Sequence, residues 1–503
     1  MKNKHLAILL LLALAAGSGG CSTQPSQPQT AQTAQDVQAP SAPAIQADSQ
    51  AYSDEGLKKY TTPEHYLNLG AFVLFGLLSL AAWTFNPSYF ELARTFIYNL
   101  FTFNFQPLPS VFFTLNLLVG FFTGLSSGAT VIISQYYGAQ NHENVKKSVH
   151  TSIALSLAGG AIIMILGLIF SGAALQLMNT PDDIMKLSLT YMRIYFLGVI
   201  PSLIYNMGSG ILRAAGDAKR PLYFLIISCF INIILDIFFV VVLKLGVAGV
   251  AIATTLSQVA SAVMVLAALM RTTDSYKLYI REIRFAPAIL KHIIRIGLPA
   301  GLQSTMYSVS NLIIQASINA FGTDTIAAWT AYGKVDGIFW MIMGAYGVAI
   351  TTFAGQNFGA GKYDRIHKSV KVCLGMAAFT SVLLSAVVLL GGRIFFRLFT
   401  SDDSVIDIGL HMMAVISPSY ITYICIEILG GTARGCGDSI IPMLLTCFGI
   451  CVLRVIWILV IVPLRPDVST VAFSYPLTWT VTSVMFIIYY LRGNWLKRRR
   501  GLQ

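Results

Sequence analysis

Charged side chains are scarce in this sequence. Asp, Glu, Lys and Arg make up 11% of its 503 residues, whereas soluble domains contain about 25%. Hydrophobic residues make up 55%, and the mean hydropathy is +0.68. These values exclude an ordinary soluble domain and indicate a polytopic membrane protein.

Motifs of the common enzyme classes are also missing. The sequence has no Walker loop, dinucleotide-binding fingerprint, nucleophile elbow or HExxH motif. Its seven cysteines form no CxxC motif and have no histidine at metal spacing. Cys447 and Cys451 share a face of an apolar helix, so we interpret the cysteines as packing residues. We expect no enzyme activity, no metal site and no cofactor beyond a coupling ion.

The first 68 residues differ from the rest of the chain. Residues 1–21 combine Lys2 and Lys4 with an apolar run and small residues before Cys21, as in an export signal. The run is shorter than the roughly 20 residues that span a bilayer. We predict Cys21 as the lipidation site of a bacterial lipoprotein signal; the alternative is an uncleaved apolar N-terminus. Residues 22–68 are predicted to form a disordered tether.

Apolar runs of spanning length follow, six in each half of the chain. They predict an all-α polytopic membrane protein of about 12 transmembrane helices. An N-terminal lobe at 69–271 and a C-terminal lobe at 292–492 are joined by a linker at 272–291 and followed by a basic tail at 493–503. The predicted spans are 69–86, 110–135, 148–170, 187–212, 221–243, 247–270, 292–318, 327–354, 369–391, 405–432, 442–463 and 470–491.

Lys and Arg gather in alternate loops, which predicts the orientation. The loops after 135, 212, 270, 354 and 432 and the C-terminal tail carry most of them, so these are predicted to be cytoplasmic. The intervening loops carry few, such as Lys186. A lipidated Cys21 outside the membrane would require an extra crossing at 87–106, whereas a cytoplasmic N-terminus would not. Both arrangements stay open.

A block of sequence occurs twice at a fixed offset of 221 residues. Gln135 matches Gln356, and Lys147 matches Lys368. An even number of spans in each copy makes this a parallel duplication. Each copy also has an Arg–Gly–Asp–Pro element, which we interpret as structural: Arg completes one helix, Gly ends it, and Asp and Pro begin the next. These elements contain Arg213, Asp217 and Pro221, and Arg434, Asp438 and Pro442.

Four motifs resemble one transporter family. They are GLSSGATVIISQYYGA at 124–139, GILRAAGD at 210–217, GLPAGLQ at 297–303 and FAGQNFGAG at 353–361. In this order they resemble the multidrug and toxic compound extrusion (MATE) family over about residues 110–495. The resemblance implies two six-helix lobes around a central cleft, and export of organic, often cationic compounds driven by inward Na⁺ or H⁺. Many members carry an acidic residue in the first helix, but 69–86 has none.

Glu427 is the leading candidate for ion coupling. It lies about two helical turns inside the membrane, where a carboxylate needs a partner or a function. The equivalent residue of the first copy is Asn206, so only one lobe has a titratable group at this position, and we assign Asn206 to the ion-coupling set as its amide counterpart. The alternative is that Glu427 is a hydrogen-bonding tie between helices.

Asp336 is a candidate for the substrate cleft. It shares a helix face with Tyr332 and Trp340, and an acid between aromatic rings suits an organic cation. The alternative is that Asp336 is solvated near the outer end of its span.

Asp236 is a second candidate for ion coupling. It follows Asn232 by one turn in a polar stripe of an apolar helix, which favours a cleft or another helix over lipid. The alternative is an interhelical ion pair with Arg193 or Arg454.

Further polar residues follow Pro299 at intervals of four, which predicts a cleft-facing helix or interhelical amide bonding. They are Gln303, Tyr307, Asn311, Gln315 and Asn319. Small residues are predicted to let helices approach closely. They are Gly124, Gly128, Gly344 and Gly347.

Together these features predict a secondary-active exporter of small organic compounds in a bacterial inner membrane. We expect it to be monomeric, with the bilayer and small organic substrates as partners and no nucleic acid. The alternatives are a lipid-linked glycan flippase of related fold, which should have a more basic cleft, and a lipid-anchored membrane protein that does not transport.

Overall fold

The computed structural model describes residues 109–177 and 182–492, and in these ranges the fold is entirely helical. The N-terminal lobe contains α5 (Pro109–Gly138), α6 (His142–Leu177), α7 (Asp182–Leu197), α8 (Val199–Ala214), α9 (Lys219–Asp236), η2 (Ile237–Val242) and α10 (Gly246–Arg271). The linker contains η3 (Ile280–Glu282). The C-terminal lobe contains α11 (Pro287–Asn319), α12 (Thr323–Gly359), α13 (Tyr363–Arg397), α14 (Asp403–Ile416), η4 (Ser417–Ser419), α15 (Tyr420–Gly435), α16 (Ile440–Thr446), η5 (Cys447–Val452), α17 (Leu453–Leu464) and α18 (Val468–Leu491).

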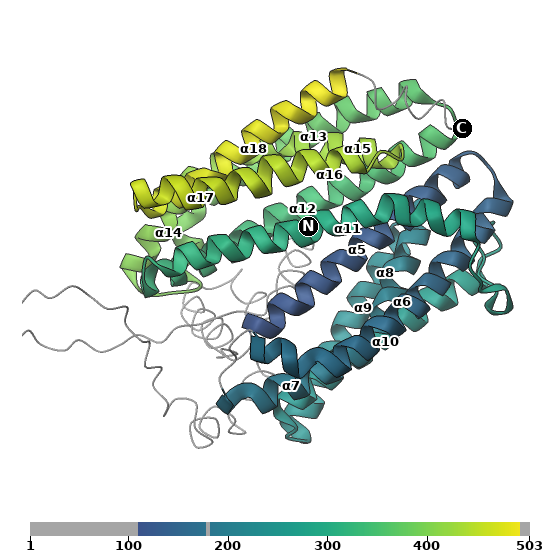
Figure 1. Ribbon diagram of the computed structural model, residues 1–503, viewed down its shortest axis with the longest axis horizontal. Coiled ribbons are helices and arrows are strands. Elements are labelled where there is room, and N and C mark those ends of the chain that lie inside the picture. The colour runs from purple at the N-terminus through teal and green to yellow at the C-terminus, as the bar shows by residue number, and fades with distance from the viewer. Residues whose placement is uncertain (1–108, 178–181, 493–503) are drawn as a thin grey trace, which may run out of the picture.

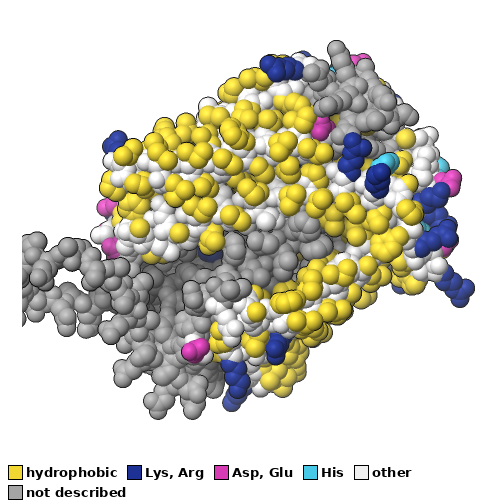
Figure 2. All heavy atoms as spheres, in the orientation of Figure 1, with side chains coloured by type: hydrophobic (Ala, Val, Ile, Leu, Met, Phe, Trp, Pro, Cys, Tyr) yellow, Lys and Arg dark blue, Asp and Glu magenta, His cyan; other side chains and the backbone are white. Residues whose placement is uncertain are grey.

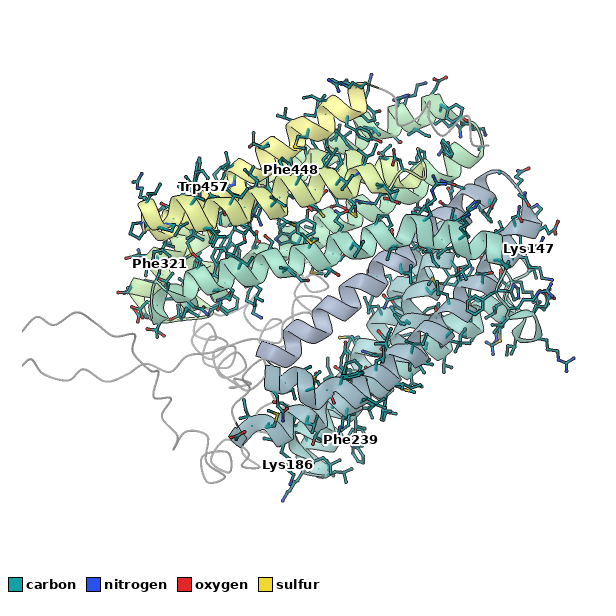
Figure 3. The ribbon with its side chains drawn as sticks, in the orientation of Figure 1. Lys147, Lys186, Phe239, Phe321, Phe448 and Trp457 are labelled. Carbon is teal, nitrogen blue, oxygen red and sulfur yellow. The ribbon has the colours of Figure 1, made fainter. Side chains whose placement is uncertain are left out.

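The helices extend between the left and right ends of the molecule in Figure 1 and form two groups. Lys147, predicted to be cytoplasmic, lies at one end, whereas Lys186 and Phe321 lie at the other (Figure 3). The predicted all-α architecture of two lobes is confirmed. Each of the eleven predicted spans between 110 and 491 corresponds to a helix or a consecutive set of helices. The first predicted span, Cys21, the tether and the basic tail lie outside the described residues.

Several of these spans are interrupted. Eight described helices are long and apolar enough to cross a membrane, and α7 with α8 gives a ninth if the pair is one span bent by 45°. Two spans contain a π-helical turn: η2 directly follows Asp236, and η5 directly precedes α17. Such turns are rare and often lie at functional sites.

The surface agrees with a bilayer environment. Hydrophobic side chains cover the flanks of both lobes in the view of Figure 2, and Lys and Arg gather toward the ends. Residues such as Ile169 and Leu390 are 65% and 89% exposed. Lipid would cover these side chains, which water would not stabilise.

Close packing of α5 on α11 joins the two lobes. A Cβ added to Gly128 would lie 2.6 Å from the carbonyl oxygen of Ile293, and one added to Gly297 would lie 2.8 Å from that of Leu125. A glycine is therefore required at this crossing. The prediction of close approach is confirmed for Gly124, Gly128 and Gly347. It is wrong for Gly344, where no described atom would lie within 4 Å of the added Cβ, because this position faces no neighbouring helix.

Candidate functional site

Asp336 is enclosed by three hydrogen-bond donors inside the C-terminal lobe. Its Oδ1 accepts from the hydroxyls of Tyr332 at 3.2 Å and Tyr420 at 2.7 Å, and its Oδ2 accepts from Nε1 of Trp340 at 2.6 Å. Tyr332 and Trp340 lie one turn to either side on α12, and Tyr420 begins α15. Asp336 is 9% exposed, so the alternative of a solvated carboxylate is wrong. A carboxylate with three donors is held in one position.

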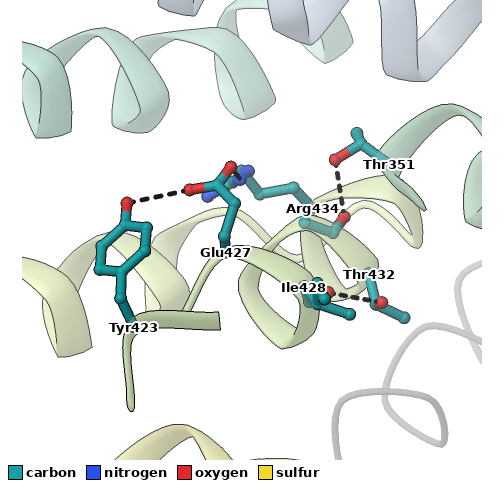
Figure 4. A network of polar contacts seen from close by, with 7 residues as sticks. Thr351, Tyr423, Glu427, Ile428, Thr432 and Arg434 are labelled. Atoms are coloured by element: carbon teal, nitrogen blue, oxygen red, sulfur yellow. Dashed lines mark hydrogen bonds and ion pairs between the residues drawn. The ribbon is translucent and has the colours of Figure 1, made fainter. Parts of the chain in front are cut away.

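Glu427 on α15 also has two polar partners (Figure 4). Its carboxylate accepts from the hydroxyl of Tyr423 at 3.1 Å and pairs with Nη2 of Arg434 at 3.5 Å. The glutamate and arginine side chains are 21% and 14% exposed. The position of Gly347 on α12 admits this carboxylate, because an added Cβ there would lie 2.7 Å from its Cδ. Arg434 therefore does more than complete its helix: it also partly balances the charge of Glu427.

Aromatic rings connect the two carboxylates. The ring of Trp340, which donates to Asp336, lies 4.8 Å from that of Tyr423, which donates to Glu427, in a T-shaped arrangement. Trp479 on α18 lies 5.9 Å and 5.5 Å from these two rings. Asp336 and Glu427 thus belong to one network of acids and aromatic side chains.

Arg454 is a buried cation of the same lobe. It is 2% exposed; its Nη2 donates to Oγ1 of Thr478 at 3.0 Å, and its guanidinium lies 4.0 Å from the ring centre of Tyr475. A cation over an aromatic face is stabilised, most of all when both are shielded from water. From the sequence, Arg454 is a charged residue in an apolar helix and a possible partner of Asp236, and this position in an apolar helix is its one signal as a site residue.

Asp236 lies in the N-terminal lobe, directly before the π-helical turn. Asp236 forms no ion pair with Arg193 or Arg454, so that alternative is wrong for the described residues. Its Oδ1 and Nδ2 of Asn232 are inaccessible to solvent and have no hydrogen-bond partner among the described residues. An acceptor and an amide without partners are costly in a low-dielectric environment, which suits a site completed by another group.

The side chain of Asn206, the counterpart of Glu427, forms a hydrogen bond within its own helix. Its side-chain Nδ2 donates to the backbone carbonyl of Ser202 at 2.9 Å, and its backbone carbonyl accepts from the hydroxyl of Ser126 on α5 at 3.1 Å. The structure does not bring this amide to Asp236 through any hydrogen bond between described residues. The equivalent positions of the two lobes therefore have different chemistry.

The polar residues of α11 lie in several environments. Tyr307 packs against the hydrophobic core of the C-terminal lobe. Gln303 is partly buried and Asn311 is exposed. Nε2 of Gln315 donates to Oδ1 of Asn319 at 2.9 Å, one turn along the same helix. Among the described contacts, Tyr307 is thus a packing residue, and Gln315 and Asn319 form an amide pair. These contacts do not show that all five polar residues of α11 line one cleft.

The lobes are hydrogen-bonded to each other at the end predicted to be cytoplasmic. Nε2 of Gln135 donates to the carbonyl of Gly435 at 2.7 Å, and Nε2 of Gln356 donates to the carbonyl of Ala214 at 2.7 Å. Each amide supplies a donor to a carbonyl at the C-terminus of a helix in the other lobe, which has no partner within its own helix. In the sequence, both glutamines stand out only as matching positions of the repeat.

The repeated loop elements lie at helix ends. Gly216 and Gly437 have φ values of +95° and +89°, the left-handed conformation typical of a residue that ends a helix. Oδ1 of Asp217 accepts from the backbone N–H groups of Lys219 and Arg220. Asp438 accepts from the hydroxyl of Tyr489 at 2.5 Å. Pro221 and Pro442 each occupy the third position of a helix.

No group of three or more His, Cys, Asp and Glu side chains in the described ranges could hold a metal ion. The carboxylates lie instead with aromatic hydroxyls, amides and one arginine. Such groups can bind a proton or a monovalent cation, and aromatic faces can bind an organic cation.

Comparisons with known proteins agree with this architecture. A family model described as MatE matches residues 110–238 and 299–460. The chain is 27% identical over 391 residues to the "Probable multidrug resistance protein YoeA" of Bacillus subtilis, covering 76% of this chain and 84% of that protein. It is 25% identical over 334 residues to the "Multidrug export protein MepA" of Staphylococcus aureus, covering 65% and 73%. A crystal structure of MATE in the straight conformation has a TM-score of 0.73 at 21% identity, covering 89% of this chain and 100% of that one.

Proposed function

Because this chain belongs to the MatE family, we propose that it is a secondary-active exporter of small organic compounds, driven by an inward gradient of Na⁺ or H⁺. The names of its relatives as multidrug resistance and multidrug export proteins support this substrate class. Its apolar helices make it a multi-pass membrane protein, and a bacterial inner membrane fits the bacterial relatives. In this proposal the protein has no enzyme activity, and it works as a monomer without nucleic acid.

Glu427 carries the proposal. It is an ionisable side chain within a membrane-spanning helix, held by Tyr423 and Arg434, whereas the other lobe has Asn206 at the equivalent position. Such a residue is costly in a membrane unless it has a structural partner or a function. A cation or proton that binds the carboxylate of Glu427 and displaces Arg434 would change the net charge of this part of the C-terminal lobe. That change would favour one conformation over another.

Asp236 and Asn232 form the second part of the proposed coupling machinery. Their atoms without partners offer a carboxylate oxygen to a cation, and an amide that can orient a bound group. The two lobes would then contribute differently: one provides a carboxylate already paired with arginine, and the other a carboxylate whose partner comes from elsewhere.

The aromatic network suits an organic cation. Asp336 is fixed by Tyr332, Tyr420 and Trp340, so its negative charge acts on the surrounding rings from a constant position. The partly exposed ring of Trp340, with the polar side chains of α11, would contribute to the surface of the cleft between the lobes. Gln303, Tyr307, Asn311 and Gln315 are the α11 residues assigned to it.

Transport requires the lobes to separate at one end and then at the other. The bonds of Gln135 and Gln356 hold them together at the predicted cytoplasmic end. We therefore interpret the described conformation as closed at that end. Ion binding and substrate binding would change its population through their different affinities for the two states.

The decisive experiment compares the wild-type protein with Glu427→Gln in proteoliposomes. Efflux of a fluorescent organic cation is measured under an imposed Na⁺ gradient, an imposed proton gradient, or neither. We expect the wild type to respond to one gradient and the variant to insert normally but lose that response. Tyr423→Phe is the matched control, because it removes the hydrogen bond to Glu427 and keeps the carboxylate. An undiminished gradient response of Glu427→Gln would exclude its coupling role.

A further inference from the structure

The linker between the lobes is docked on the N-terminal lobe along residues 272–286. The backbone N–H of Tyr279 donates to Nε2 of His150 at 3.0 Å, and that of Ala286 donates to Oγ1 of Thr151 at 3.1 Å. Leu278 is 3% exposed within this lobe's hydrophobic core. Because main-chain bonds and a buried side chain hold it at several points, the linker presents a fixed outer face.

Both acidic residues of this segment are bound by groups of the lobe. Oδ2 of Asp274 accepts from the hydroxyl of Tyr137 at 3.1 Å. Glu282 pairs with Nζ of Lys146 at 2.7 Å, and this hydrogen bond keeps the pKa of Glu282 below its usual value. The glutamate therefore stays ionised and is compensated by a residue outside the linker.

The basic residues of the segment outnumber its acids, although the charge of Arg284 also acts on Glu282. Lys277, Arg281 and Arg284 form no ion pair within the part of the chain that the structure describes. Arg281 and Arg284 are exposed. Lys277 is half-buried, and its Nζ lies 5.5 Å from the ring centre of Tyr279. The segment thus has two exposed arginines and one half-buried lysine, whereas both of its acids are bound by groups of the lobe.

Apolar side chains are exposed between these cations. Ile280 is 66% exposed and Phe285 is 45% exposed, and each is adjacent in sequence to one of the arginines. Exposed isoleucine and phenylalanine are unfavourable in water, but they are stable at the boundary between headgroups and acyl chains. Alternating cationic and apolar residues are typical of a segment that lies in the membrane interface.

The position of the linker matches this interpretation. It joins the end of α10, which is long and apolar enough to cross a membrane, to the start of α11 (Figure 1). It contacts α6 through Lys146, His150 and Thr151, next to Lys147 at the end of the molecule shown in Figure 3. We propose that the linker is an interfacial segment that binds the phosphate headgroups of anionic phospholipids in the cytoplasmic leaflet through Lys277, Arg281 and Arg284, with Ile280 and Phe285 inserted among the acyl chains.

This proposal does not depend on the transported substrate and can be tested on the whole protein. The protein is purified from bilayers of equal phosphatidylglycerol and phosphatidylcholine, and the retained lipids are counted by native mass spectrometry. We compare the wild type with Lys277→Gln/Arg281→Gln/Arg284→Gln. A basic residue at an anionic surface changes affinity by about fivefold, so we expect the variant to lose nearly all phosphatidylglycerol that the wild type retains in preference to phosphatidylcholine.

The matched control is Lys362→Gln/Arg365→Gln/Lys368→Gln. It removes the same charge from exposed residues at the same end of the C-terminal lobe, and we expect it to keep the preference. Equal loss in both variants would mean that net charge alone attracts the lipid, and equal retention would mean that the linker does not bind it. Either result overturns the proposal.

Two further arms examine the source of the anion and the apolar contact. Excess inorganic phosphate should not displace the phosphatidylglycerol, because a free anion lacks the acyl chains; displacement would overturn the lipid assignment. Ile280→Ser/Phe285→Ser keeps all three cations and should also reduce retention, by about a hundredfold on the basis of two large apolar side chains. Unchanged retention would contradict insertion of these side chains. Size-exclusion profiles of all variants verify that they are folded.

Discussion

The side-chain amide of Gln135 donates to the backbone carbonyl of Gly435 at 2.7 Å, across the boundary between the two lobes. The bond from Gln356 to Ala214 has the same length, and its residues are the equivalents of the first pair in the repeat. The duplication therefore generates two reciprocal contacts. Each copy provides the donor of one and the acceptor of the other.

Replacing these glutamines should make the predicted cytoplasmic end open more often. A hydrogen bond contributes about 1 kcal/mol, or about a fivefold change in an equilibrium constant, so Gln135→Ala and Gln356→Ala should each have that effect. Ser134 is fully buried beside Gly355, where only separation of the lobes would expose it. The measurement is the rate at which a maleimide labels Ser134→Cys in a background without other cysteines.

The control for this prediction is Gln315→Ala. Nε2 of Gln315 donates to Asn319 on the same helix, α11, so its replacement should leave the labelling rate unchanged. The double variant Gln135→Ala/Gln356→Ala should be labelled faster than either single variant. Identical rates in all of these proteins would show that the two bonds do not restrain the lobes.

The hydrogen bonds to the carboxylate of Asp336 should stabilise the folded protein. Tyr420→Phe removes its 2.7 Å bond, and Tyr332→Phe removes its 3.2 Å bond. Hydrogen bonds to charged groups contribute about 1.5–3 kcal/mol, and the shorter bond should contribute more. We expect thermal midpoints in detergent to decrease in the order wild type, Tyr332→Phe, Tyr420→Phe. Asp336→Asn should fall lowest, because an amide presents a donor where only donors surround it. An unchanged midpoint for Asp336→Asn would contradict the enclosed carboxylate.

Two glycine positions should respond in opposite directions to alanine. At Gly128 the new Cβ would lie 2.6 Å from the carbonyl oxygen of Ile293, so α5 and α11 must move apart, at a cost of about 1–3 kcal/mol. At Gly344 the new Cβ meets no described atom within 4 Å, and alanine favours a helix over glycine by up to about 1 kcal/mol. Thermal midpoints should therefore fall for Gly128→Ala and stay equal or rise for Gly344→Ala. The same change in both variants would contradict the crossing at Gly128.

Most of the helical architecture could be predicted from the sequence, because spanning helices need long apolar runs and the repeat requires the same topology in both lobes. The interruptions could not. The bend between α7 and α8 and the π-helical turns of η2 and η5 leave the apolar pattern unchanged, since they alter backbone hydrogen bonding within a continuous apolar segment. The prediction for Gly344 failed for a similar reason: composition does not tell which face of a helix has a neighbour.

Within the site, contacts along one helix were predictable and contacts between helices were not. The spacing of four residues brought Tyr332 and Trp340 to Asp336, as the structure shows. Tyr420 donates to the same carboxylate from a position 84 residues away. Glu427 and Arg434 are seven residues apart and so share a face of α15, and the long arginine side chain reaches back two turns to the carboxylate. Long-range partners depend on tertiary packing, which a single sequence does not specify.

The last prediction concerns Asp236. If Oδ1 of Asp236 and Nδ2 of Asn232 form part of an ion site, then Asp236→Asn should remove the charge that attracts a cation while it preserves the volume of the side chain. A ligand at 100 times its dissociation constant stabilises a protein by about 2.7 kcal/mol. The thermal midpoint of the wild type should therefore rise as NaCl replaces choline chloride, or as pH is lowered if the ion is H⁺, and that of Asp236→Asn should not. Asn206→Ala is the control, because its amide already bonds to Ser202, and it should respond as the wild type does. A full response of Asp236→Asn would place the ion elsewhere in the protein, and Glu427→Gln in the same titration would show whether the C-terminal lobe holds it.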